Sequence, residues 1–321
     1  MSAADGGGVV GKVVISGPAS WNRIVLLEHL PEPVPHMQFA LGDHETVGGT
    51  SAGKALGLAA LGREVELFTL IGPDADGDRL REVLTRVPGL DLHAIDGGRT
   101  ERHLNLMTPL GERVSLYLST PDDRPTQDDA RLEVEMESAA AIVLDLCERS
   151  RRMIPDARAS GRPIWTDVHD YDGDAEYHRP FLDAAEAIFM NADRIGADPL
   201  PFMRHRIDEG ARLVVCTLGA EGVVAVAALE GGGMSEHRVD AVPVDVLDTN
   251  GAGDAFMSGV LHATLDGAGI DAALRLGAEQ AAEVLGTPHL HPSLDALLPP
   301  ASAVVEEARS GSEPTAPGAL A

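Results

Sequence analysis

The sequence predicts an α/β fold in which a central, mostly parallel sheet is flanked by helices. Short apolar runs recur along the chain, each bounded by polar or turn residues, as is typical of strands buried on both faces. Stretches with the length and mixed polarity of helices separate these runs, which is the alternation that parallel strands require. The runs are KVVISG (12–17), AAIVLDL (140–146), PIWTDV (163–168), AIFMNA (187–192) and RLVVCTLG (212–219).

Two segments interrupt this alternation. Residues 99–120 predict a β-hairpin, because alternating side chains on both arms flank the turn TPLGE. The proline-containing segment 22–46 could supply further strands of the same unit. We therefore predict a small β lid on one α/β domain that spans residues 11–308. Residues 1–10 and 309–321 have the Gly- and Pro-rich composition of disordered tails.

Composition excludes several classes of partner. The 321 residues are 44% hydrophobic, enough for a large core, and their formal charge of −26 disfavours nucleic acid and anionic membranes. Cys147 and Cys216 lie in apolar runs, where thiols usually pack as small hydrophobic groups. His289 and His291 are expected in a surface loop and not at a metal. Without a signal peptide or a long apolar run, a cytoplasmic location is expected.

Polar residues close several of the predicted strands. Asp145, Asp167, Asn191 and Thr217 each follow or end an apolar run. Ligands of open α/β sheets gather at the carboxyl ends of the parallel strands. These four positions are therefore candidates for a binding site.

The segment LDTNGAGDAFMSG (247–259) combines a loop of small residues with two aspartates. Gly251 and Gly253 allow successive backbone N–H groups to converge, and Ala252 adds little bulk. From about Ala252 onward the pattern predicts a helix, so the loop adds the positive end of a helix dipole. Such an arrangement suits a phosphate or a phosphoryl group in transfer.

Spacing alone favours a simpler interpretation of the two aspartates, in which Asp254 stabilises the first helical turn and Asp248 bonds its own turn. The segment also resembles the C-terminal signature of the PfkB (ribokinase-like) family of carbohydrate and nucleoside kinases, D-T-x-G-A-G-D-x-F. All seven fixed positions match: Asp248, Thr249, Gly251, Ala252, Gly253, Asp254 and Phe256.

Three further segments resemble motifs of the same family, and they occur in the family's order. GGTSAGKALGLAALG (48–62) is similar to its glycine-pair signature, LIGPDADGD (70–78) to its G-x-D-x-x-G segment, and CTLGAEGVV (216–224) to its nucleotide loop. The resemblance covers about residues 12–292. It implies a ribokinase-like fold and an ATP-dependent kinase that phosphorylates a hydroxyl group of a sugar or sugar-like molecule.

The resemblance assigns catalytic roles to the glycine loop. Asp254 matches the family's catalytic base, which accepts the proton of the attacking hydroxyl group. The amides of residues 251–254 would form an anion hole for the phosphoryl group. Mg²⁺ would arrive with the phosphates of ATP. Asp248 and Asn250 match positions that help to hold a monovalent cation, so K⁺ is a further candidate cofactor.

Four residues would contact the nucleotide. Thr217, Gly219 and Gly222 match the nucleotide loop, for which a plain turn between strands is the alternative. Asn191 matches the Asn of the family's N-x-x-E motif. Arg194 occupies the Glu position of that motif, and this departure removes an acid linked to Mg²⁺.

On the sugar side, Gly48 and Gly49 match the glycine pair, with a plain turn as the alternative. Asn22 replaces a common Asp and can both accept and donate hydrogen bonds. Gly53 stands where the family usually has Asn, and Lys54 follows it in a chain with only two lysines. A cation near a helix start indicates a nearby anion, such as a phosphate or carboxylate of the substrate. A solvated helix face is the simpler alternative.

Two other functions are compatible with these motifs. One is a nucleoside kinase, for which Trp21 and Phe39 would be the stacking residues, although aromatic content is only 3%. The other is a nucleotide- or sugar-binding regulator without turnover, against which the intact glycine loop and Asp254 argue. Lids of this family often pair with the lid of a second subunit, so the resemblance also implies a homodimer.

Overall fold

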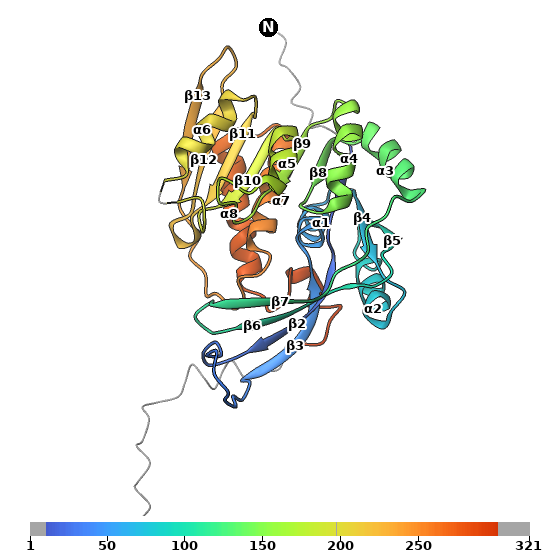
Figure 1. Ribbon diagram of the computed structural model, residues 1–321. Helices are drawn as coiled ribbons and strands as arrows, with labels where there is room; N and C mark the ends of the chain where they lie inside the picture. The colour runs from blue at the N-terminus through green and yellow to red at the C-terminus, as the bar shows by residue number, and fades with distance from the viewer. Residues whose placement is uncertain (1–10, 197, 301–321) are drawn as a thin grey trace, which may run out of the picture.

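The computed structural model describes residues 11–196 and 198–300, which form two sheets with helices on both sides of the larger one (Figure 1). The segments 1–10 and 309–321, predicted as tails, lie outside the described residues. The strands of the large sheet are β1 (Val13–Ser16), β4 (Val65–Ile71), β5 (Leu90–Asp96), β8 (Ala141–Leu144), β9 (Ile164–Asp167), β10 (Ala187–Asn191), β11 (Leu213–Thr217), β12 (Val223–Ala228) and β13 (Met234–Val239).

This nine-stranded sheet has the order β13-β12-β11-β10-β9-β8-β1-β4-β5. Neighbouring strands from β11 to β5 are parallel, whereas β12 and β13 are antiparallel to their neighbours. The predicted mostly parallel sheet is therefore confirmed. All five apolar runs of the sequence form strands in its middle, where both faces are covered.

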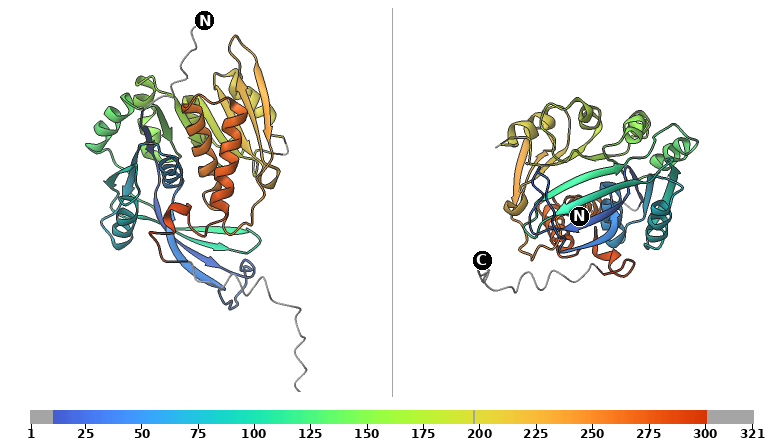
Figure 2. Two further views of the ribbon diagram at one scale, coloured as in Figure 1. Left: turned by 180° about the vertical axis from the view of Figure 1, so that it is seen from behind. Right: turned by 60° about the horizontal axis from the view of Figure 1, so that its bottom comes forward.

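Helices cover both faces of the large sheet, and alternate strand residues face opposite layers. In β1, Val13 and Ile15 contribute to one hydrophobic core, whereas Val14 contributes to the other. The first layer holds α1 (Thr50–Ala60), α2 (Ala75–Leu84), α7 (Ala252–Leu265) and α8 (Ile270–Leu285). The second layer holds α3 (Asp128–Glu137), α4 (Glu148–Ala159), α5 (Arg179–Ala184) and α6 (Leu200–Asp208). Figure 2 shows α7 and α8 side by side across the first face.

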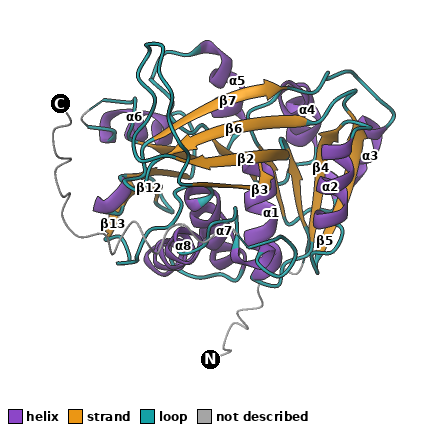
Figure 3. Cartoon of the chain, turned by 90° about the horizontal axis from the view of Figure 1, so that it is seen from below, coloured by secondary structure: helices purple, strands orange, loops and turns teal. Residues whose placement is uncertain are grey.

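The small sheet has the order β3-β2-β6-β7. Its strands are β2 (Ser20–Leu26), β3 (Gly42–Gly48), β6 (Glu101–Met107) and β7 (Arg113–Ser119). β6 and β7 pair antiparallel as the predicted hairpin, and the segment around 22–46 supplies β2 and β3. The small sheet crosses one end of the large sheet, as the view from below shows (Figure 3).

The two cysteines and two of the histidines agree only in part with the sequence expectations. Cys216 is buried as expected, whereas Cys147 is partly exposed and caps α4 by accepting a hydrogen bond from the Ser150 amide. The expectation that His289 and His291 lie in a surface loop is wrong, because these residues are only 2% and 4% exposed. His289 packs against the small sheet, where its Nδ1 lies 3.2 Å from Thr46 Oγ1.

Across the described ranges, no helix has both the length and the apolar character needed to span a membrane.

Candidate active site

A polar cavity of about 740 Å³ lies between the small sheet and the carboxyl ends of the central strands. Strand ends of an α/β sheet are where ligands gather, and the central strands β9, β10 and β11 each contribute their last residue to the cavity wall. Most of the residues predicted for the site line it: Asn22, Gly48, Gly49, Asn191, Thr217, Asp248, Asn250, Gly251, Gly253 and Asp254.

A second cavity of about 620 Å³ is mainly apolar and lies between β12 and the helices α7 and α8. Of the predicted nucleotide residues, Thr217, Gly219 and Gly222 line it. Thr249 and Gly253 line both cavities, as does Thr217. The glycine loop therefore stands at the junction of a polar and an apolar compartment.

The glycine loop ends at the first residue of α7, as the sequence predicts. Gly251 caps the helix with a φ of 80°, and an added Cβ would lie 2.7 Å from the carbonyl oxygen of Leu290. Ala255 donates the first intrahelical bond, 2.9 Å long, to Gly251 O. The amides of residues 252–254 precede that bond and are therefore available to a ligand at the helix N-terminus.

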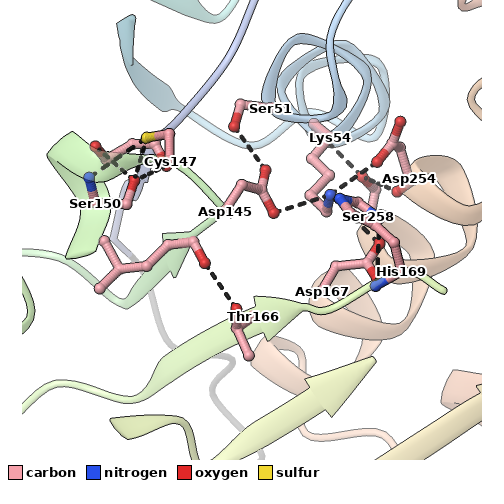
Figure 4. A network of polar contacts seen from close by, with 12 residues as sticks. Ser51, Lys54, Asp145, Cys147, Ser150, Thr166, Asp167, His169, Asp254 and Ser258 are labelled. Carbon is pink, nitrogen blue, oxygen red and sulfur yellow. Dashed lines mark hydrogen bonds and ion pairs between the residues drawn. The ribbon is translucent and has the colours of Figure 1, made fainter. Parts of the chain in front are cut away.

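Asp254 belongs to a buried ionic cluster (Figure 4). The Lys54 ammonium lies 2.8 Å from Asp254 Oδ1, 3.0 Å from Asp145 Oδ1 and 3.6 Å from Asp167 Oδ2. Asp145 and Asp167 follow or end the strands β8 and β9, so the strand-end positions singled out in the sequence do converge. The backbone amide of His169 donates to Asp167 Oδ1 at 2.9 Å.

The environment separates the pKa values of the carboxyl groups. Burial raises the pKa of Asp254 to about 6, against the opposing effect of the Lys54 charge. For Asp167 the effect of burial is outweighed by the charges of His169 and Lys54, which hold its pKa well below the usual range. Burial would lower the pKa of His169, but Asp167 raises it to about 9. Asp254 is thus suited to exchange a proton near neutral pH, whereas Asp167 stays ionised.

The structure does not give Lys54 the expected contact with a substrate anion. Its side chain is 1% exposed, does not line either cavity and ends among three carboxylates of the chain itself. The alternative of a solvated helix face is wrong for the same reason. The anion predicted near this cation is therefore internal to the protein.

Asp248 and Asn250 form the internal turn that spacing alone suggested. Asp248 Oδ1 accepts from both the backbone N and the Nδ2 of Asn250, each at 2.7 Å. The guanidinium of Arg113 donates to Asn250 Oδ1. A cationic side chain therefore already contacts Asn250, and a K⁺ site at this pair stays a prediction.

The nucleotide loop is a turn between β11 and β12 that also lines the apolar cavity. It contains the 3₁₀ turn η2 (Gly219–Glu221), followed by Gly222 with a φ of 88°. A Cβ on Gly222 would lie 2.1 Å from Val239 O, whereas a Cβ on Gly219 would meet nothing within 4 Å. The loop can therefore be both a turn between strands and part of a nucleotide-binding site.

Gly222→Ala is expected to destabilise the protein more than Gly219→Ala. Both residues have positive φ, which costs an alanine about 1–2 kcal/mol, but only the Gly222 variant adds a collision with β13. Urea unfolding of the two variants would measure the difference. Equal free energies of unfolding would show that the loop relaxes freely and that Val239 does not fix its position.

On the sugar side, the glycine pair allows a close approach of backbone and side chains. A Cβ on Gly48 would lie 2.0 Å from Asn22 Nδ2, and one on Gly49 would lie 2.5 Å from Pro18 O. Asn22 Oδ1 accepts a hydrogen bond of 2.8 Å from Ser20 Oγ. The side chain of Asn22 is thereby held at the cavity wall.

Several cavity residues were not predicted from the sequence. His103 and Asn105 reach the cavity from β6, and Asp170 and Asp193 reach it from loops after β9 and β10. The signal for the first two was present, because residues i and i+2 of a strand share a face. Arg194, at the family's Glu position, instead makes ion pairs of 3.7 Å with Asp170 and 3.5 Å with Asp172.

The fold and this site define a phosphotransferase of the ribokinase-like class. A family model described as pfkB family carbohydrate kinase matches residues 40–296, and the chain belongs to this family. It is 32% identical over 272 residues to an acarbose 7(IV)-phosphotransferase of Actinoplanes sp., covering 83% of this chain and 89% of the relative. The protein is therefore a carbohydrate kinase.

Solved structures agree with this assignment. A microbiome-derived acarbose kinase superposes with a TM-score of 0.74 at 28% identity, covering 94% of this chain and 98% of that one. A ribokinase of Arabidopsis thaliana complexed with ribose and ATP superposes with a TM-score of 0.70 at 18% identity, covering 92% and 98%. The second likeness shows the fold alone, and the fold is the predicted one.

Proposed function

We propose that the protein transfers the γ-phosphoryl group of ATP to a hydroxyl group of a sugar, with Asp254 as the general base. One observation carries the proposal. The carboxyl group of Asp254, whose pKa burial raises to about 6, lines the polar cavity from the first turn of α7, next to Gly253, which lines both cavities. Positioning, charge stabilisation and a proton acceptor are what phosphoryl transfer needs.

The two cavities suit the two substrates. The apolar cavity offers the adenine base side chains such as Phe256 and Leu285, and Thr217 and Gly253 lead from it toward the polar cavity. The polar cavity offers hydrogen-bonding groups to sugar hydroxyls, including Asn22, His103 and Asn105. ATP would then place its γ-phosphate beside the glycine loop, facing the sugar.

In the reaction, Asp254 accepts the proton of the sugar hydroxyl as its oxygen forms a bond to the γ-phosphorus. The bond between that phosphorus and the β,γ-bridging oxygen breaks, and ADP leaves with the bonding electrons. The amides of residues 252–254 stabilise the charge on the phosphoryl oxygens. Asp170 and Asp193 face the polar cavity and would bind, through water, the Mg²⁺ that neutralises the phosphates.

The small sheet is proposed to act as a lid that excludes water from the transfer. It covers the polar cavity with residues of β2 and β6, and β7 forms its edge. Val114, Leu116 and Leu118 of β7 are exposed, and pairing with a second lid would cover them. These exposed apolar side chains support the expected homodimer.

The positions of Trp21 and Phe39 do not support a nucleoside as the substrate. Trp21 and Phe39, the residues expected to stack on a nucleoside base, do not line the polar cavity. Trp21 packs beneath the Arg79 guanidinium, which lies 6.0 Å from its ring centre, and Phe39 is exposed. The acarbose kinases among the similar proteins make acarbose a natural member of a test panel.

A substrate panel assayed for ADP release tests the proposed function. It should contain acarbose, pentoses, hexoses and nucleosides, each with MgATP and with the Asp254→Asn variant as the control. We expect ADP release with at least one sugar, together with transfer of phosphate to that sugar. Turnover of nucleosides alone would favour the nucleoside kinase, and binding without any turnover would favour the non-catalytic regulator.

A further inference from the structure

Lys54 makes contacts that the transfer reaction as described above does not use. It is one of two lysines in the chain and one of the largest fully buried side chains among the described residues. A buried ammonium is costly unless carboxylates pair with it, and Lys54 lies within 3.6 Å of three of them. Since one of the three is Asp254, this cation acts directly on the catalytic carboxylate.

The packing of α1 against α7 brings Lys54 and Asp254 together. A Cβ on Gly53 would lie 2.6 Å from Asp254 Oδ2, and one on Gly57 would lie 2.9 Å from Ser258. Ser258 Oγ lies 3.0 Å from the carbonyl oxygen of Lys54 and 2.9 Å from that of Asp254. The glycine at position 53, which departs from the family's Asn, is thus required for this approach of the two helices.

The neighbouring groups complete the cluster on the side of the large sheet. Asp145 accepts a hydrogen bond of 2.6 Å from Ser51 Oγ and is itself fully buried. Asp167 is paired with His169, whose Nδ1 lies 3.4 Å from its carboxylate. Three carboxylates face two cations, so with all five groups charged the cluster carries one excess negative charge. A proton accepted by Asp254 removes that excess.

We propose that Lys54 is a positioning residue for catalysis, a buried counter-ion that keeps Asp254 ionised and oriented and balances the cluster when the substrate proton arrives. Lys54 does not contact the substrate, since it does not line the cavity. It acts through Asp254, so the inference rests on the proposed role of that residue as the base. Asp145 and Asp167 hold the ammonium in place and oppose its effect on Asp254.

Lys54→Met and Asp145→Asn are expected to shift the ionisation of Asp254 in opposite directions. Loss of the Lys54 cation should raise the titration midpoint of Asp254 by about 1–3 pH units, because an opposite charge at this distance favours the ionised carboxylate. Loss of the Asp145 charge should lower it, since Asn keeps the shape and can still bond to Ser51. Carboxyl ¹³C NMR of aspartate-labelled protein, with the Asp254 signal assigned by its absence in Asp254→Asn, measures both shifts without substrate.

The pH profile of kcat gives the catalytic readout. Lys54→Met should lose activity at neutral pH and regain it in alkaline buffer. Asp145→Asn should move the acidic limb of the profile to lower pH. Lys12→Met is the matched control, because this other lysine pairs with Glu66 and Glu135, and none of the three lines either cavity. If Lys54→Met does not fold, the downward shift in Asp145→Asn still tests the cluster.

An unchanged Asp254 midpoint in the Lys54 and Asp145 variants would overturn the inference, as would a loss of activity that is uniform at every pH. Failure of the proposed function has a different signature. In that case no sugar is phosphorylated by the wild type, yet the NMR midpoints still report whether Lys54 controls the ionisation of Asp254. The two hypotheses can therefore fail separately.

Discussion

Asp254→Asn is expected to lower kcat by about 10²–10⁴-fold, the usual contribution of a general base, while both substrates still bind. The amide cannot accept the proton of the attacking hydroxyl group, but it occupies the same space and can still contact Lys54. Activity of the wild type should fall as the pH drops through about 6, because the base works only when ionised and burial raises its pKa to that value. Steady-state kinetics across pH, with calorimetry for binding, measure both effects.

The matched control for this variant is Asp266→Asn, which changes an exposed aspartate at the other end of the same helix. Asp266 caps the C-terminus of α7 and pairs with Arg63 there, away from both cavities. Its replacement should leave kcat within about twofold of the wild type, because this side chain lines neither cavity and surface changes usually alter stability by only about 0.5 kcal/mol. Equal activity of the Asp254 variant and the wild type would rule out Asp254 as the base.

Gly251→Ala is expected to lower kcat by about 10²-fold or more through loss of the anion hole. Its φ of 80° disfavours any side chain, and the new Cβ would meet Leu290 O at 2.7 Å, so the loop must move. Displaced amides no longer converge on the phosphoryl group. Single-turnover kinetics at saturating ATP measure the loss at the chemical step.

Gly253→Ala provides the comparison within the same loop. A Cβ at this position meets no protein atom within 4 Å and projects into space that borders both cavities. Its folding stability should therefore match the wild type, whereas KM for ATP should rise because the methyl group narrows the phosphate passage. If Gly251→Ala retains wild-type kcat, the amides of this loop do not form the anion hole.

The sequence predicted those parts of the fold that depend on local pattern. Apolar runs bounded by polar residues can be identified without tertiary information, and each of the five became a strand of the large sheet. The hairpin at 99–120 followed from side-chain alternation around a turn that contains Gly111. Strand order follows from long-range packing, and the sequence analysis did not predict it.

The candidate site was predicted less completely, because it depends on contacts between distant segments. Motif positions such as Asp254 and Gly251 could be assigned, and strand ends pointed to Asp145 and Asp167. The pairing of Lys54 with residues 91, 113 and 200 positions away could not be read from its neighbours, which suggest a solvated helix face. The buried position of His289 likewise depends on packing against β3.

A crystal structure with ADP, aluminium fluoride and the accepted sugar would test most directly whether Asp254 and the glycine loop carry out the transfer. We predict that an Asp254 carboxylate oxygen lies within about 2.6–3.2 Å of the acceptor hydroxyl group, as a general base requires. The amides of residues 252–254 should donate to the fluoride ligands. An acceptor hydroxyl group bound away from Asp254, with the metal fluoride held by other donors, would contradict the proposed mechanism.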